Sequence, residues 1–261
     1  MNIRIKYLLR RFIAILSFVI IVTGDAKAQE NVTTLGIQVK PMIPSRFLNT
    51  GPTSAERENL SVNLTPKLGW NFGMMIRRGI TKMWSFETGI NLVQRNYNLT
   101  FNSTELPETA ELNFRLIGYE IPVQGLIYVQ LGKQLWMNVS GGVSLDLYPS
   151  NIQSSDFIRR DSVTYDFYQK TFRNGWLQTS VLANIGFEWR TKKDGYFYLG
   201  TSYHRPFRYM GFVSAEFTPN NLATQRIEFP VSGNYLTADL RYFFHENPER
   251  KKSTKTKKAP K

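Results

Sequence analysis

The feature that most constrains the fold is a repeated alternation of apolar and polar residues, with a period of two. Between Leu135 and Leu147 the odd positions are apolar or glycine, whereas most even positions are small or polar. The stretch from Leu177 to Trp189 repeats this pattern. A period of two places alternate side chains on opposite faces of a β-strand. The pattern therefore predicts long strands that each have one apolar and one polar face.

Eight segments show the alternation, at residues 35–43, 68–76, 84–92, 119–129, 135–147, 177–189, 197–203 and 236–244. Short connections at 78–82, 131–133 and 191–195 contain Gly or Asp-Gly, which is typical of tight turns. Long connections occupy 45–63, 100–112, 149–175 and 213–229. This layout predicts an all-β fold: an eight-stranded antiparallel up-and-down transmembrane β-barrel with short periplasmic turns and long extracellular loops. Ten strands, with 157–168 paired into the wall, is the structural alternative.

The composition of the two strand faces indicates whether the outside of the barrel contacts lipid or water. A soluble lipocalin-like barrel would expose the polar face, which here consists of Gly, Ser, Asn and Gln with few Lys or Glu. The same small and amide residues suit a packed polar lumen, and aromatic residues gather near strand ends as in interface girdles. We therefore expect the apolar face to contact lipid, in the outer membrane of a Gram-negative bacterium.

The chain has two basic ends around a nearly ordinary body. Residues 1–28 carry five Lys or Arg against Asp25, and 245–261 carry seven against two Glu, out of a net charge of +13. A charged start, about 11 apolar residues and an Ala-x-Ala site predict a signal peptide over 1–28, cleaved between Ala28 and Gln29. The barrel then covers 29–244, and 245–261 is a basic periplasmic tail too polar to fold. Because the charge sits at the ends, nucleic-acid binding is not expected.

The strand around Glu120 resembles that of a known family. Tyr119-Glu120-Ile121-Pro122-Val123 and the Gly-rich strand after it are similar to the PorT-like outer-membrane β-barrels of Bacteroidota. That resemblance implies a barrel, with a link to gliding motility and type IX protein secretion. The last strand, which ends in Tyr242 and Phe244, resembles the terminal strand by which such barrels are recognised for assembly. Pro122 itself costs a ladder hydrogen bond and predicts a bulge or an interrupted edge.

Charged residues of both signs fall on the predicted lumen face, and eight strands leave an interior just wide enough for side chains. We expect them to form a plug of ion pairs, with a gated ion pathway as the alternative. The predicted network consists of Lys67, Arg77, Glu87, Glu120, Asp146, Glu188, Arg190, Asp239 and Arg241.

Few residues point to catalysis or to a cofactor. The chain has no cysteine and only two histidines, which excludes thiolate metal sites, disulfides and a multi-histidine centre. Ser202 and His204 share one strand face, and some lipid A deacylases use such a pair, but no orienting acid is identifiable. We therefore expect no enzyme activity and no cofactor.

The loops and the tail are the expected contact surfaces. Loop 149–175 could project as a hairpin and meet an extracellular ligand, and Asp161-Ser162-Val163 resembles a Bacteroidota O-glycosylation sequence, with Ser162 as acceptor. The tail would face peptidoglycan or an acidic periplasmic partner. The predicted function is a non-enzymatic structural or interaction barrel among outer-membrane lipids, accessory to type IX secretion or surface assembly. A small porin, or a lipid A-modifying hydrolase, is the alternative.

Overall fold

The computed structural model describes residues 32–44, 47–106, 109–160, 163–191, 194–219 and 223–244. Apart from the 3₁₀ turn η1 (Phe47–Asn49), all regular structure in these ranges is β-strand. The strands are β1 (Thr33–Ile43), β2 (Thr53–Arg57), β3 (Leu60–Gly79), β4 (Trp84–Ser103), β5 (Ala110–Gln130), β6 (Leu135–Leu147), β7 (Ile152–Arg160), β8 (Val163–Arg173), β9 (Leu177–Arg190), β10 (Tyr196–Pro206), β11 (Gly211–Pro219), β12 (Gln225–Val231) and β13 (Tyr235–Phe243). In the described ranges, no helix has the length and hydropathy needed to cross a bilayer.

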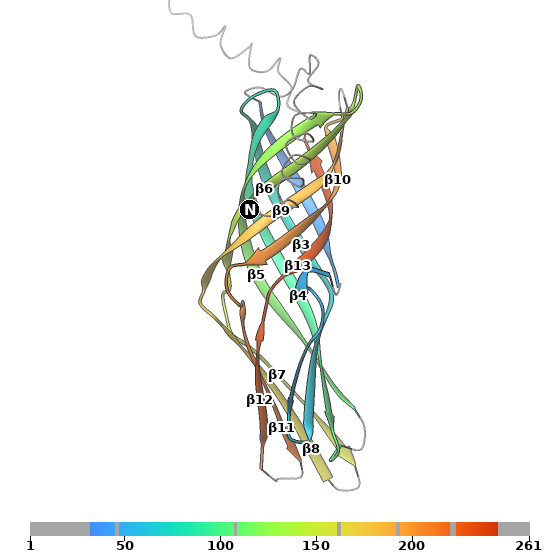
Figure 1. The fold of residues 1–261 in the computed structure, drawn as a ribbon, viewed down its shortest axis with the longest axis vertical. Helices are drawn as coiled ribbons and strands as arrows, with labels where there is room; N and C mark the ends of the chain where they lie inside the picture. The colour runs from blue at the N-terminus through green and yellow to red at the C-terminus, as the bar shows by residue number, and fades with distance from the viewer. Residues whose placement is uncertain are drawn as a thin grey trace, which may run out of the picture.

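Eight strands close into an antiparallel ring in the order β1-β13-β10-β9-β6-β5-β4-β3, and β3 pairs back onto β1 (Figure 1). Each ring strand coincides with one of the eight predicted segments, to within one residue at the end of β13 and with longer strands in most other cases, so the predicted barrel is confirmed. The ten-strand alternative is wrong because residues 157–168 pair outside the wall. Thr33 pairs with Arg78 and Gly36 with Phe243, which places both described ends of the chain beside the short turns.

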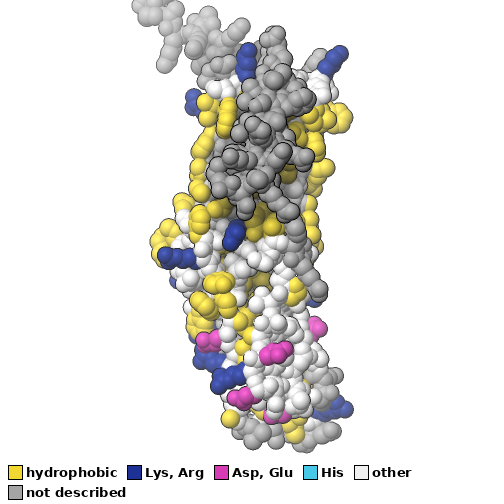
Figure 2. All heavy atoms as spheres, in the orientation of Figure 1, with side chains coloured by type: hydrophobic (Ala, Val, Ile, Leu, Met, Phe, Trp, Pro, Cys, Tyr) yellow, Lys and Arg dark blue, Asp and Glu magenta, His cyan; other side chains and the backbone are white. Residues whose placement is uncertain are grey.

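The apolar face of the barrel points outward. On β9, Val181, Ile185 and Phe187 are exposed, whereas Ser180, Asn184 and Glu188 are buried inside. Figure 2 shows apolar side chains along the flanks of the upper half of the molecule, with Asp and Glu in the lower half. Exposed apolar residues around a polar interior are the reverse of a soluble barrel and form the lipid-facing band of a membrane barrel.

All four long connections expected as loops contribute strand residues to a second layer of structure beyond the barrel. The halves of β3, β4 and β5 that lie away from the short turns continue past the ring and, with β2, make one four-stranded sheet. The second sheet has the order β12-β11-β8-β7. β7 lies against β5 and β12 against β2, so the two sheets face each other as a β-sandwich (Figure 1). The sandwich sits at the end opposite the short turns, which is the extracellular end.

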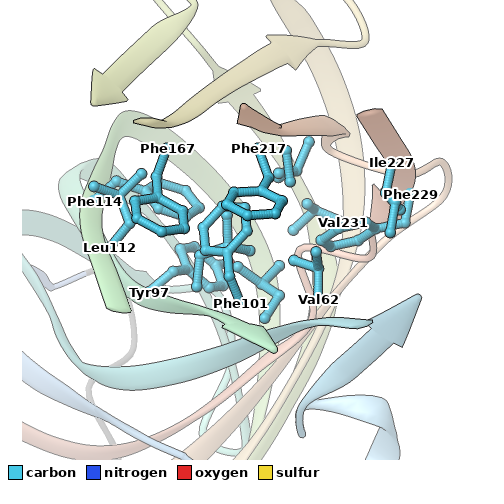
Figure 3. Packing of buried hydrophobic residues seen from close by; sticks show 14 of the residues in the cluster. Val62, Tyr97, Phe101, Leu112, Phe114, Phe167, Phe217, Ile227, Phe229 and Val231 are labelled. Atoms are coloured by element: carbon cyan, nitrogen blue, oxygen red, sulfur yellow. The ribbon is translucent and has the colours of Figure 1, made fainter. Parts of the chain in front are cut away.

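The sandwich has its own apolar core. Phe101 from β4, Phe167 from β8 and Phe217 from β11 are essentially inaccessible and meet between the sheets (Figure 3). The ring centroids of Phe167 and Phe217 lie 5.4 Å apart in a stacked arrangement. The outer face of β5 carries Glu111 and Arg115, which are exposed. The side-chain pattern is therefore apolar inside and polar outside, opposite to that of the barrel.

A β-bulge in β3 joins these two patterns. Apolar residues occupy even positions on both sides of it, but Leu64 points inward and Trp70 points outward. The pairing register with β4 shifts between Lys67 and Trp70, because two residues oppose one on β4. The extra residue reverses the facing of the strand without breaking its sequence alternation. β4 and β5 have no such shift between them, so the same positions point inward along their whole length. On these two strands the inward residues change from polar in the barrel to apolar in the sandwich.

Pro122 lies in the wall of β5. Its ladder with β4 has a gap between Val123 and Glu120, but the register is the same on both sides. The hydroxyl of Thr88 donates to the carbonyl of Pro122 across this gap at 2.8 Å. Pro122 thus costs part of the ladder with β4, as expected, but it marks neither a sheet edge nor a bulge, and the bulge lies in β3.

Candidate functional site

The part of the lumen nearest the short turns contains a chain of seven ionic side chains that alternate in sign. Its order is Arg190, Glu188, Arg77, Glu87, Arg241, Asp239 and Lys40. Arg77 Nη1 lies 2.5 Å from Glu188 Oε2, and Arg77 Nη2 lies 2.9 Å from Glu87 Oε2. β3 and β9 are not neighbours in the ring, so the first contact crosses the lumen. Each interior member meets a charge of opposite sign on both sides, which is what makes burial of such charges tolerable.

Aromatic rings close the lumen at the short-turn end. The guanidinium carbon of Arg77 lies 3.6 Å from the ring centroid of Phe243, and that of Arg190 lies 4.4 Å from Trp136 and 4.7 Å from Tyr128. All three rings are buried. Cations over ring faces gain additional electrostatic stabilisation when desolvated. Aromatic rings therefore cover the ion chain on its short-turn side.

Glu120, Asp146 and His204 form a second polar cluster in the lumen, nearer to the sandwich. His204 Nε2 lies 3.0 Å from Asp146 Oδ2 and 3.7 Å from Glu120 Oε2, and its ring stacks on Tyr235 with centroids 4.4 Å apart. The hydroxyl of Tyr235 donates to Glu120, and Ser144 and Ser180 donate to Asp146.

These three side chains are of types that bind metal ions, and their nearest ligand atoms lie within 4.8 Å of one another. However, both carboxylates already accept hydrogen bonds, and His204 Nδ1 has no partner in the described structure. A metal-bound histidine usually donates through its second nitrogen. The arrangement is that of a hydrogen-bonded cluster.

Arg95 lies between the polar clusters of the lumen and the core of the sandwich. It points inward next to Val93, and Tyr97, Leu99 and Phe101 follow it on the same face of β4. These last three side chains belong to the apolar core of the sandwich. Along β4, the inward face therefore carries buried side chains from Ser85 and Glu87 near the short turns to Phe101 in the sandwich core, with a glycine at position 89.

Of the nine predicted network residues, eight point into the lumen. Seven of these are buried and Arg190 is partly buried, while Glu120 and Asp146 sit in the second cluster rather than in the ion chain. Lys67 is the exception: it is exposed, because it lies at the bulge where the strand reverses its facing. Sequence reasoning missed Lys40, which shares a face with Gln38 on β1, and Arg95, which lies beyond the predicted end of its strand.

Ser202 and His204 share a strand face but serve different clusters. Ser202 Oγ donates to Asp239 at 2.5 Å, whereas His204 contacts Asp146. Both side chains are buried within the barrel. The lipid A hydrolase hypothesis requires them to face an accessible rim.

Several predicted positions lie outside the described residues. They are the signal peptide with Ala28 and Gln29, the glycosylation candidate Ser162, and the basic tail 245–261.

Comparison with known proteins adds two distant structural likenesses. No protein-family model and no curated protein sequence matches the chain. The outer membrane protein OprG from Pseudomonas aeruginosa is 10% identical, with a TM-score of 0.48 over 85% of this chain and 100% of that one. The outer membrane protease OmpT from Escherichia coli is 11% identical, with a TM-score of 0.35 over 83% and 97%. Identities this low carry no inference about activity.

The structure itself supports a membrane location. A closed ring leaves no unpaired strand edge in the wall, which is what a lipid environment demands of a β-structure. The exposed apolar band, the polar lumen and the short turns on one side complete the pattern of an outer-membrane barrel. The chain is an eight-stranded antiparallel β-barrel of the Gram-negative outer membrane.

Proposed function

We propose that this protein is a non-enzymatic outer-membrane barrel that holds its extracellular sandwich in place as an interaction module. The observation that carries the proposal is the continuity of β3, β4 and β5 from a filled barrel into a sandwich with its own core. A barrel whose interior is packed with side chains can serve as a membrane anchor. The polar surface available for contacts with other molecules belongs to the sandwich.

The resemblance of the strand at Glu120 to PorT-like barrels of Bacteroidota supports a more specific role. We propose an accessory function in type IX secretion or in assembly of surface structures. The basic tail adds a candidate periplasmic contact, to peptidoglycan or to an acidic partner, through charges that act over about 8–10 Å at physiological salt.

The filled lumen argues against the small-porin alternative. Arg77 and Glu188 join opposite walls of the barrel, with Phe243 packed beneath Arg77. Planar-bilayer recording of the purified protein should therefore show no steady conductance. A stable channel whose conductance changes in Glu188→Gln would overturn this reasoning.

The surface of β7 offers a place to test the interaction role. Phe157 is 64% exposed and is flanked on its strand by the exposed charges Asp156 and Arg159. An exposed aromatic residue with a polar surround has the composition of an interface anchor.

Cross-linking on intact outer membranes should capture a partner with wild-type protein and lose it with Phe157→Ser. A variant lacking 246–261 is the control, because it keeps the sandwich and removes only the tail. If the two variants and the wild type all capture no specific protein, the interaction role is wrong.

A further inference from the structure

A small cavity lies in the wall where the barrel meets the sandwich. It is lined by the end of β1, the segment that leads into β2, the part of β3 just before its bulge, the middle of β4, and the segment between β12 and β13 with the adjoining strand ends. Its volume is about 40 Å³. A site of this size holds roughly three water molecules, or one compact group such as a phosphate or a carboxylate.

Arg95 lines this cavity and is the unusual residue in it. Its side chain is only 5% exposed, yet no Asp or Glu in the described part of the chain lies within ion-pair distance of it. Its Nε is buried without a hydrogen-bond acceptor. By contrast, Arg77, Arg190, Arg241 and Lys40 all contact a carboxylate. Asp146 acts on Arg95 electrostatically from the neighbouring Glu120–His204 cluster but does not contact it. A buried guanidinium without a direct carboxylate contact is stabilised by a ligand that accepts hydrogen bonds from it.

The aromatic neighbours of Arg95 do not neutralise it. Its guanidinium carbon lies 4.9 Å from the ring centroid of Tyr235 and 5.7 Å from that of Tyr148. Burial raises the pKa of the nearby Tyr97 phenol, so this group stays protonated and uncharged at neutral pH. Ring faces orient the guanidinium but leave its positive charge in place.

Lys67 brings a second positive charge to the same cavity from its exposed side. The bulge sets Lys67 directly above Leu68 and Trp70, which are 50% and 45% exposed on the lipid-facing wall. The mouth of the cavity therefore lies at the boundary between the apolar band and the extracellular side, at the level of lipid headgroups. Ser232 and Asn234 add a hydroxyl and an amide to the lining.

We propose that this cavity binds a phosphate group, with Arg95 beneath it and Lys67 at its mouth. A guanidinium offers paired donors that match phosphate oxygens, and an ammonium adds a point charge. The phosphate could belong to a membrane lipid or be free in solution, and the two sources share this chemistry.

Titration calorimetry of the purified barrel in a neutral maltoside detergent tests the site. Inorganic phosphate and a short-chain phosphatidic acid are the two probes, and short-chain phosphatidylcholine is the zwitterionic comparison. We expect phosphatidic acid to bind and salt to weaken its binding. Arg95→Gln should weaken it by about ten- to a hundredfold, because a buried charged hydrogen bond is lost. Lys67→Gln should weaken it by about two- to fivefold, since this charge is exposed.

Lys133→Gln is the matched control, because Lys133 is an exposed lysine in a turn at the opposite end of the barrel. It should leave binding unchanged. Heat-modifiable migration of each variant checks folding, and Lys67→Gln keeps the test decisive if Arg95→Gln does not fold. Tighter binding of phosphatidic acid than of phosphate assigns a lipid source, and equal binding assigns free phosphate. Absence of binding by both probes, or binding that Lys67→Gln and Lys133→Gln leave equally unchanged, overturns the proposal.

Discussion

Replacing Phe217 by Ala tests whether the sandwich is a structural unit distinct from the barrel. Phe217 is 0% exposed and stacks on Phe167 at 5.4 Å and on Tyr165 at 6.4 Å between ring centroids. Truncating a buried Phe to Ala costs about 3–5 kcal/mol. The two stacked pairs, each contributing about 0.5–1.5 kcal/mol, place this site in the upper half of that range.

A loss of about 4 kcal/mol is large for one domain, since whole domains are stable by about 5–15 kcal/mol. This loss of stability raises the fraction of molecules with an unfolded sandwich about a thousandfold. The barrel should be unaffected, because Phe217 belongs to a sheet outside the ring. Cells that express Phe217→Ala should therefore lose the sandwich to added protease rapidly, while the residual barrel keeps its heat-modifiable migration.

Phe157→Ala is the matched control. It removes the same ring from the same sheet, but at a position that is 64% exposed. Its cost should stay within about 0.5 kcal/mol, as for surface substitutions in general. If the two variants are cleaved at equal rates, the apolar core described for the sandwich does not hold it together. If Phe217→Ala abolishes the barrel migration, the two parts do not unfold separately.

Three further outcomes follow from the barrel and its tail. Glu188→Gln leaves Arg77 and Arg190 short of a counter-charge in the lumen and should destabilise the barrel by about 3–5 kcal/mol, measured as a lower urea midpoint for unfolding in vesicles. Deleting Leu68 removes the extra residue of the bulge and should leave membrane assembly intact, whereas deleting Met74 forces either Arg77 toward lipid or Trp70 into the lumen and should abolish assembly, as followed by outer-membrane fractionation. Deleting 246–261 should preserve insertion and abolish salt-sensitive retention on peptidoglycan; unchanged retention at low salt would show that the tail binds nothing there.

The barrel could be predicted from sequence because each wall strand has two chemically different faces. The alternation from Leu177 to Trp189 predicts the strand. If the barrel lies in lipid, it also predicts that the apolar side chains point outward and the polar ones inward. The sandwich could not be predicted in the same way. Leu60 to Leu64 continue the even-numbered apolar pattern of Leu68 to Ile76, so the reversal of facing at Lys67 leaves no trace in the alternation.

Individual lumen residues can be predicted from sequence only where the bounds of their strand are predicted correctly. Arg77, Glu87 and Arg241 lie on polar faces of predicted strands and meet in the structure. Arg95 was missed because its strand extends beyond the predicted end at residue 92. Which charges pair across the lumen, such as Arg77 with Glu188, depends on ring closure and is not encoded in any local pattern.

The unbroken strands also determine how the protein carries mechanical load. β5 contains 21 residues and runs from the extracellular sandwich to the periplasmic turn, roughly 70 Å along the strand. No flexible linker separates β3, β4 or β5 into two parts. A force on the sandwich along these strands therefore acts in shear on the hydrogen-bonded ladders of the wall, where many bonds share it at once. A torque on the sandwich likewise turns the barrel within the membrane as one body.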